Sequence, residues 1–165
     1  MIRPVLQLPH HVLATPCEAV GELDDRAREV AQDLLDTMRG SPHSVGVAAP
    51  QIGVSLRIAV VDITGHRKAK SCHGEVVLID PVVVESAGPE VGREGCMSVP
   101  DLTGDVARYT SLHVRAMGLD GEHHDYEVDA FEARAFQHEI DHLQGLLFLD
   151  RVVADDRVFR RRVYR

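Results

Sequence analysis

Residues 130–144 constrain the fold most, because they predict a helix that is apolar on more than one side. One face of this segment carries an apolar stripe at helical spacing, made of Phe136, Ile140, Leu143 and Leu147. Phe131 adds an apolar side chain to the opposite face. Asp129 and Glu132 have capping-box spacing at the start, and Gly145 suits the position after the last turn. We therefore expect this helix to be buried on more than one face.

The remainder of the chain predicts strands and further helices. Residues 24–39 combine an acidic start, apolar residues at spacings of three and four, and a closing Gly40, which predicts a helix. Segments rich in Val and Ile predict strands at 57–63, 75–85, 111–117 and 124–128. The Asp120-Gly121 turn joins the last two strands, Gly88-Pro89 is expected to interrupt the strand pattern, and a final helix is expected near Asp155. This order predicts an α+β fold with mixed or antiparallel sheets packed around the helix at 130–144.

Length and composition narrow the functional class. The chain has 165 residues, which suits a single domain spanning 1–165. Its net charge of −8 gives it no general attraction to DNA or to an anionic membrane. Three irregularly spaced cysteines do not predict a disulfide framework, and no segment reaches the ~18 apolar residues that a membrane span needs. Together with an N-terminus that lacks a signal-peptide pattern, these features predict a cytoplasmic protein.

The C-terminal segment 151–165 is the local exception to the acidic balance. It contains six arginines against two aspartates: Arg151, Arg157, Arg160, Arg161, Arg162 and Arg165, with Asp155 and Asp156. Such a segment is either a solvated helix end or a docking surface for RNA or a ribosome.

The sequence His-Glu-Ile-Asp-His at residues 138–142 carries the clearest chemical signal. On a helix, His138 and His142 are four residues apart, so both imidazoles can reach one metal ion. Glu139 lies about 100° around the helix from His138, where it can reach a water without binding the metal. Two ligands and one general base on a rigid element are the requirements of metal-assisted hydrolysis. The alternative is a pair of surface histidines that share a helix by chance.

A catalytic tetrahedral site needs a third protein ligand. The segment after His142 contains no His, Glu or Cys, and its only possible ligands are Asp150, Asp155 and Asp156, so the third ligand is expected upstream. The upstream candidates include several Glu and His residues and three cysteines, Cys17, Cys72 and Cys96. Spacing alone does not select among them.

Three separated segments occur in the order typical of one enzyme family. They are Gly46-Val47-Ala48-Ala49-Pro50-Gln51-Ile52-Gly53, Glu94-Gly95-Cys96-Met97-Ser98 and Gln137-His138-Glu139-Ile140-Asp141-His142-Leu143. With these motifs the chain resembles the peptide deformylases, and it departs from the usual family residues at Ser44, Met97 and Thr103. The resemblance implies a metal-dependent hydrolase that removes the formyl group from formyl-methionine of nascent polypeptides and releases formate.

The resemblance also implies a role for each site residue. Cys96, His138 and His142 are expected to bind the metal, which is Fe²⁺ in most members, with Zn²⁺, Ni²⁺ or Co²⁺ as substitutes. Glu139 is expected to take the proton of the attacking water, while the Gln51 amide and the Met97 N–H stabilise the oxyanion. Substrate contacts are expected from Val45, Gly46, Val47, Glu94, Gly95 and Phe131.

Two other functions remain open at this stage. One is a metallo-endopeptidase of the ordinary H-E-x-x-H type, which the missing downstream ligand disfavours. The other is a deformylase-like protein that binds N-formylmethionyl peptides and has lost turnover. The implied partners are therefore formylated peptides and, through the arginine-rich tail, a ribosome.

Overall fold

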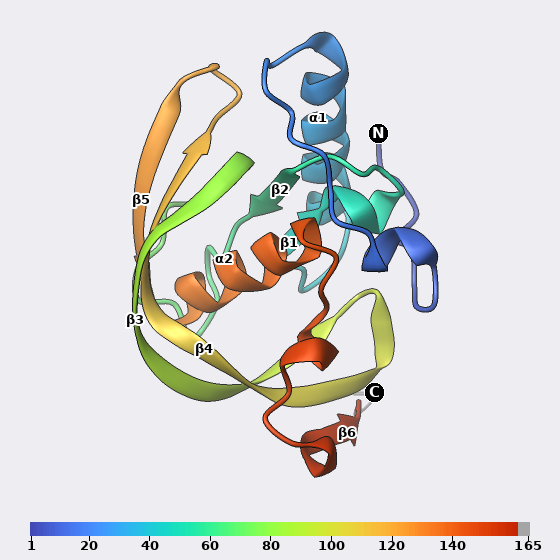
Figure 1. The fold of residues 1–165 in the computed structure, drawn as a ribbon, viewed down its shortest axis with the longest axis vertical. Helices are drawn as coiled ribbons and strands as arrows, with labels where there is room; N and C mark the ends of the chain where they lie inside the picture. The colour runs from blue at the N-terminus through green and yellow to red at the C-terminus, as the bar shows by residue number, and fades with distance from the viewer. Residues whose placement is uncertain (162–165) are drawn as a thin grey trace.

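The computed structural model describes residues 1–161, which form one curved sheet and two long helices (Figure 1). The helices are α1 (Asp25–Arg39) and α2 (Ala130–Leu143). The strands are β1 (Gly46–Ala48), β2 (Ile58–Val61), β3 (Val76–Cys96), β4 (Val99–Met117), β5 (His123–Asp129) and β6 (Val158–Arg160). Short 3-10 helices occur at His11–Ala14, Ala49–Ile52, Phe148–Arg151 and Asp155–Arg157.

The sheet has the order β1-β2-β3-β4-β5, and β6 adds to β4. Each of these strand pairs is antiparallel. The long strands β3 and β4 curve with β5 around α2, which crosses the middle of the molecule (Figure 1). The predicted α+β class is confirmed, and so is the burial of helix 130–144 on more than one side.

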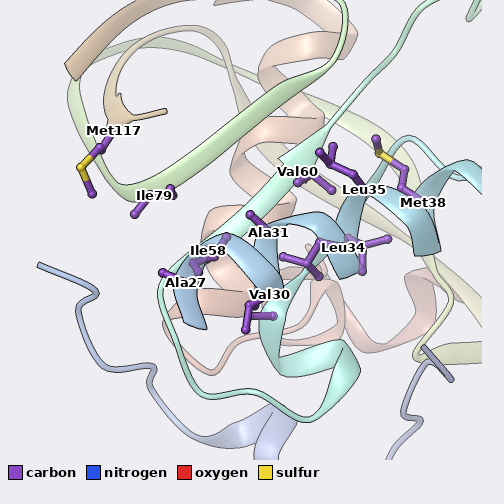
Figure 2. Close-up of a cluster of buried hydrophobic side chains, with 12 residues drawn as sticks. Ala27, Val30, Ala31, Leu34, Leu35, Met38, Ile58, Val60, Ile79 and Met117 are labelled. Carbon is purple, nitrogen blue, oxygen red and sulfur yellow. The ribbon is translucent and has the colours of Figure 1, made fainter. Parts of the chain in front are cut away.

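Strands β1 and β2 lie between the two helices, because their alternate side chains face opposite layers. Val47 and Val60 join the apolar cluster around α1, which Figure 2 shows. Ala48 and Ala59 pack instead against Leu143 of α2. All four residues of β2 are buried as a result. Helix α1 begins as predicted, with the Asp24 side chain accepting a hydrogen bond from Ala27 N at 2.8 Å.

The β3–β4 hairpin is much longer than the sequence predicts. The expected strand at 75–85 continues to Cys96, and the strand expected from 111 begins at Val99. Gly88-Pro89 does not end the strand, because this part of β3 has β4 on one side only and an edge strand tolerates the missing proline N–H. Cys96 pairs with Val99 across a two-residue turn, so the cysteine lies at the tip of the hairpin.

Two local predictions are wrong. The helix expected near Asp155 is a single 3-10 turn followed by β6, because Val158 and Phe159 extend along the edge of β4. Asp129 makes no side-chain capping bond to α2, since its carboxylate accepts the N–H of Ser71 at 3.1 Å.

Within residues 1–161, none of the helices has the length and apolar character needed to cross a bilayer.

Candidate active site

Helix α2 brings the three functional residues of the His-Glu-Ile-Asp-His segment to one side. The His138 and His142 rings lie 5.1 Å apart between centroids. His142 is buried, and the side chain of His138 is 12% exposed. The four-residue spacing has therefore placed both imidazoles together, as the sequence predicts.

Cys96 completes the cluster from the tip of the β3–β4 hairpin. Its Sγ lies 3.5 Å from His142 Nε2, and the nearest donor atoms of Cys96, His138 and His142 lie within 4.8 Å of one another. One sulfur and two imidazole nitrogens suit Fe²⁺, Zn²⁺ or Ni²⁺. The residues present therefore fit a metal ion, and Cys96 is the cysteine that lies beside the two histidines.

Glu139 faces the same cluster with one carboxylate oxygen unpartnered. Its Oε1 lies 3.9 Å from His138 Nε2, and its buried Oε2 has no hydrogen-bond partner within residues 1–161. Burial raises the pKa of Glu139 to about 7, although the neighbouring His138 opposes the shift. A buried carboxylate without a partner is destabilising, so this oxygen is available for chemistry rather than for folding.

Gly46 of β1 makes the position of Glu139 possible. A Cβ at residue 46 would lie 2.9 Å from Glu139 Cγ, which is closer than real Cβ contacts. The glycine in the first motif is therefore required by the carboxylate of the third motif.

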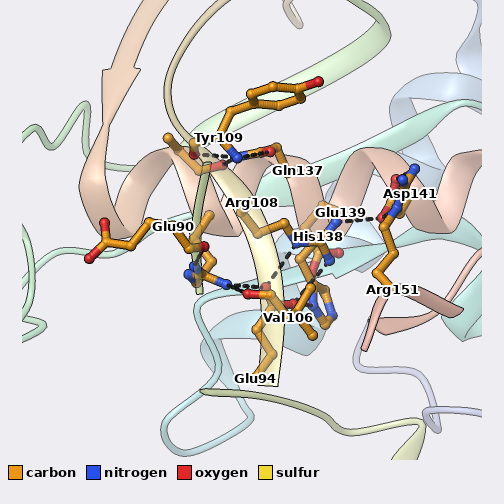
Figure 3. A network of polar contacts seen from close by, with 12 residues as sticks. Glu90, Glu94, Val106, Arg108, Tyr109, Gln137, His138, Glu139, Asp141 and Arg151 are labelled. Atoms are coloured by element: carbon orange, nitrogen blue, oxygen red, sulfur yellow. Dashed lines mark hydrogen bonds and ion pairs between the residues drawn. The ribbon is translucent and has the colours of Figure 1, made fainter. Parts of the chain in front are cut away.

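The carboxylate of Glu94 forms a hydrogen bond with the ring of His138, as Figure 3 shows. One oxygen of the Glu94 carboxylate lies 2.9 Å from His138 Nδ1. Arg108 donates two hydrogen bonds to the same carboxylate at 2.9 and 3.0 Å, and Arg134 donates another at 2.8 Å. The sequence predicted Glu94 as a substrate contact. It does line the cavity, but its oxygens are engaged by protein groups that orient the imidazole.

A second carboxylate extends this ionic cluster. Asp141 accepts hydrogen bonds from Arg108 and from Arg151, at 2.8 and 3.1 Å for the latter (Figure 3). Two carboxylates and their arginines thus surround the histidine side of α2. Sequence reasoning missed this cluster, although an aspartate inside a helix buried on more than one side is a signal for an unseen cationic partner.

The pKa values of the two imidazoles shift in opposite directions. Burial lowers the pKa of His142 well below its usual value, and the charge of His138 acts in the same direction. Burial opposes protonation of His138 as well, but its hydrogen bonds to Cys96 and Glu94 raise its pKa well above the usual range. Burial would raise the pKa of Glu94, yet the bonds from His138 and Arg108 lower it far below the ordinary carboxyl value.

Gln51 points its amide nitrogen into the cluster. Its Oε1 accepts the Ala48 N–H at 3.0 Å, which leaves Nε2 facing Ser98 Oγ at 3.1 Å and Cys96 Sγ at 3.5 Å. The N-terminal segment supports this arrangement, because Leu6 N donates to Gln51 O at 2.7 Å and Leu8 N to Ser98 O at 3.0 Å. Nothing in the sequence pattern indicated these contacts from the N-terminus.

A cavity of about 400 Å³ opens onto the cluster. Of the expected site residues, those that line it are Val45, Gly46, Gln51, Glu94, Gly95, Cys96, Met97, Phe131, His138 and Glu139. Val47 does not line it, because its side chain lies in the core against α1. His66 also lines the cavity and stacks on Phe131 at 3.9 Å between ring centroids, a contact that the sequence did not predict.

A thiol, two imidazoles and a carboxylate with an unpartnered oxygen, gathered at one cavity, are the groups that a metal-dependent hydrolase needs. Comparisons with known proteins agree with this class. The family model for polypeptide deformylase matches residues 2–158. A peptide deformylase of Acidobacterium capsulatum is 39% identical over 163 residues, which cover 98% of this chain and 94% of that relative. Peptide deformylase 1 of Bacillus cereus is 43% identical over 148 residues, 90% of each chain.

Solved structures give the same result. A peptide deformylase from Legionella pneumophila superimposes with a TM-score of 0.84 at 36% identity, covering 95% of this chain and 89% of that one. A peptide deformylase from Ehrlichia chaffeensis in complex with actinonin gives a TM-score of 0.87 at 28% identity, covering 94% and 91%. The chain belongs to the peptide deformylase family, metal-dependent hydrolases that remove the formyl group from N-terminal formyl-methionine of nascent polypeptides. The function expected from the three motifs is confirmed.

Proposed function

We propose that Cys96, His138 and His142 hold the catalytic metal of this deformylase. Their convergence is the observation that carries the proposal, because segments 42 residues apart meet with donor atoms within 4.8 Å. Bound there, the metal acts as a Lewis acid toward the formyl carbonyl and makes water more acidic. Glu94 supports the ligand set by fixing the ring of His138 through Nδ1.

Glu139 is the general base and then the general acid. Its unpartnered Oε2 accepts a proton from the attacking water, and the same oxygen returns it to the amine that leaves. Burial raises the pKa of Glu139, which makes its carboxylate a better proton acceptor than an exposed one. The products are formate and a peptide with a free N-terminal methionine.

Gln51 and Met97 stabilise the oxyanion that forms at the formyl carbon. The Gln51 amide is held by Ala48, so its N–H groups are oriented before substrate arrives. Met97 follows Cys96 in the turn and lines the same cavity, which supports its backbone N–H as the second donor.

The substrate peptide lies along β1 and Gly95. Strand β1 is at the end of the sheet order, so the main chain at Gly46 and Val47 can pair with an added strand. Val45 and Phe131 both line the cavity and form the methionine pocket in this proposal. A small formyl group fits beside Glu139, whereas an added methyl group is disfavoured by about 1–3 kcal/mol.

Fe²⁺ is the native metal in this proposal, and Zn²⁺, Ni²⁺ or Co²⁺ can replace it. The mixed thiolate and imidazole set favours this group of ions over Mg²⁺ or Ca²⁺. Metal analysis of protein purified without oxygen tests the identity of the ion directly.

Glu139→Gln is the decisive variant for the catalytic roles. It keeps all three metal ligands and removes the base, so metal content should match the wild type while formate release from formyl-Met-Ala-Ser is lost. Normal turnover of this variant would remove Glu139 from its proposed role. Wild-type protein that binds metal but releases no formate would favour the binding-only alternative. Peptide-bond cleavage that persists in Cys96→Ala would favour the endopeptidase.

We also propose that residues 1–165 act as one cytoplasmic catalytic domain that meets the ribosome through its tail. Arg151 and Arg157 are engaged by Asp141 and Asp105, so they do not form a free docking surface. Arg162 and Arg165 lie outside the described residues. Unchanged ribosome co-sedimentation after Arg162→Ser and Arg165→Ser would contradict a contact through the tail.

A further inference from the structure

The residue that follows strand β6, Arg161, places its positively charged side chain at the substrate cavity. Strand β6 pairs with Leu102–Gly104, and the next residue, Arg161, donates its backbone N–H to Asp101 O at 2.9 Å. The Arg161 side chain lines the cavity together with Gly95 and Thr103. A residue more than 60 positions away in sequence therefore lies beside the turn that carries Cys96.

The guanidinium of Arg161 packs directly against Gly95. A Cβ at residue 95 would lie 2.2 Å from Arg161 Nη2 and 3.2 Å from its Cζ. Any other residue at 95 would displace the guanidinium from this place. Because Gly95 directly precedes Cys96, the guanidinium lies one residue from the proposed metal ligand.

Two other arginines that line the cavity, Arg93 and Arg134, already have acidic partners. Arg93 donates to Asp105 at 2.8 Å and lies over the Phe159 ring at 4.0 Å. Arg134 is bound to the Glu94 carboxylate. Within residues 1–161, by contrast, no carboxylate lies within ion-pair distance of the Arg161 guanidinium. Its N–H donors are therefore available to a molecule in the cavity.

We propose that Arg161 binds the substrate, donating to a main-chain carbonyl oxygen of a residue that follows the formyl-methionine. This inference rests on the proposed function, because it requires the formyl group to lie at Glu139 and the peptide to run past Gly95. An extended peptide presents carbonyl oxygens regardless of its side chains, so a guanidinium at this place serves many sequences. Arg161 is then a substrate-binding residue that acts on affinity rather than on the chemical step.

Arg161→Ala tests the proposal with two substrates, formyl-Met-Ala-Ser-amide and formyl-Met-amide. Loss of a charge-assisted hydrogen bond at a solvent-facing site is expected to raise KM for the longer substrate about fivefold, with kcat within about twofold. KM for formyl-Met-amide should not change, because this substrate has no residue after methionine. Arg161→Lys keeps the charge without the planar guanidinium, and its KM for the longer substrate should lie between those of the wild type and Arg161→Ala.

Arg160→Ala is the matched control, since Arg160 is exposed on β6 and does not line the cavity. Equal metal content and thermal midpoint in all variants exclude a folding defect. An unchanged KM for the longer substrate overturns the proposal, as does an equal rise for both substrates. A rise seen only with the free acid formyl-Met-Ala-Ser also overturns it, because the partner is then the terminal carboxylate. Failure of the proposed function is a separate result, since wild-type protein would then release no formate from either substrate.

Discussion

Glu94→Gln should both destabilise the fold and weaken metal binding. The side chains of Glu94 and Arg108 are only 5% and 3% exposed, so this ion pair is shielded from solvent. The variant keeps the size of residue 94 but removes the charge that faces Arg108, Arg134 and His138. Breaking one partner of a buried pair costs about 3–5 kcal/mol. Because Arg108 retains Asp141, we expect the lower end, about 3 kcal/mol.

Metal affinity should fall about 10- to 100-fold in the same variant, because His138 loses the group that fixes its ring. Urea unfolding of the metal-free protein measures the first effect, and competition with a chromophoric chelator measures the second. Asp125→Asn is the control, since Asp125 pairs with Arg115 at the surface and is 51% exposed. Its loss should cost less than about 1 kcal/mol. If Glu94→Gln is no more destabilising than this control and binds metal normally, the buried ionic cluster does not position His138.

Gly46→Ala should lower kcat about 100-fold with metal content unchanged, since the added Cβ would displace Glu139. Formate release and metal analysis measure these two quantities, and a near-normal kcat would refute the packing argument. Hydrogen bonds from Arg93 and Arg157 lower the pKa of Asp105, so its stabilising effect is present above the unfolded carboxyl pKa of about 3.9 and is lost as pH falls through the lower folded value. The difference in unfolding free energy between wild type and Asp105→Asn should therefore shrink below about pH 4; a constant difference on acid titration would contradict the assignment. The Fe²⁺ form should lose activity in air by oxidation of iron and thiolate, and the Zn²⁺ form should not; timed assays with and without oxygen decide this, and indifference to oxygen in native protein would point to zinc.

Local sequence signals predicted the parts of the molecule whose structure is set locally. Helix α1 follows from its apolar spacing and Asp24 cap, and the convergence of His138 and His142 follows from helical geometry alone. Cys96 could be chosen only through the family resemblance, because its place depends on the register of a hairpin whose two strands cross 14 paired positions. That register is a long-range property, which a single sequence does not display.

The C-terminal segment was mispredicted for a similar reason. Charged residues at 155–157 look like the start of a helix, but the edge of β4 offers Val158 and Phe159 backbone pairing that an isolated helical turn cannot match. The arginines of this segment also looked alike in sequence. Tertiary partners separate them: Arg151 and Arg157 belong to ion pairs within the fold, whereas Arg161 faces the cavity.

The buried carboxylate of Glu139 limits the thermal stability that this protein can reach while it remains active. Glu139→Leu would remove a carboxylate that burial destabilises, and we expect this variant to melt at a higher temperature and to be inactive. Selection for turnover therefore holds the centre of α2 below its thermal optimum. More stable variants that remain active therefore need their stabilising substitutions in the outer strands and loops, which take no part in the reaction.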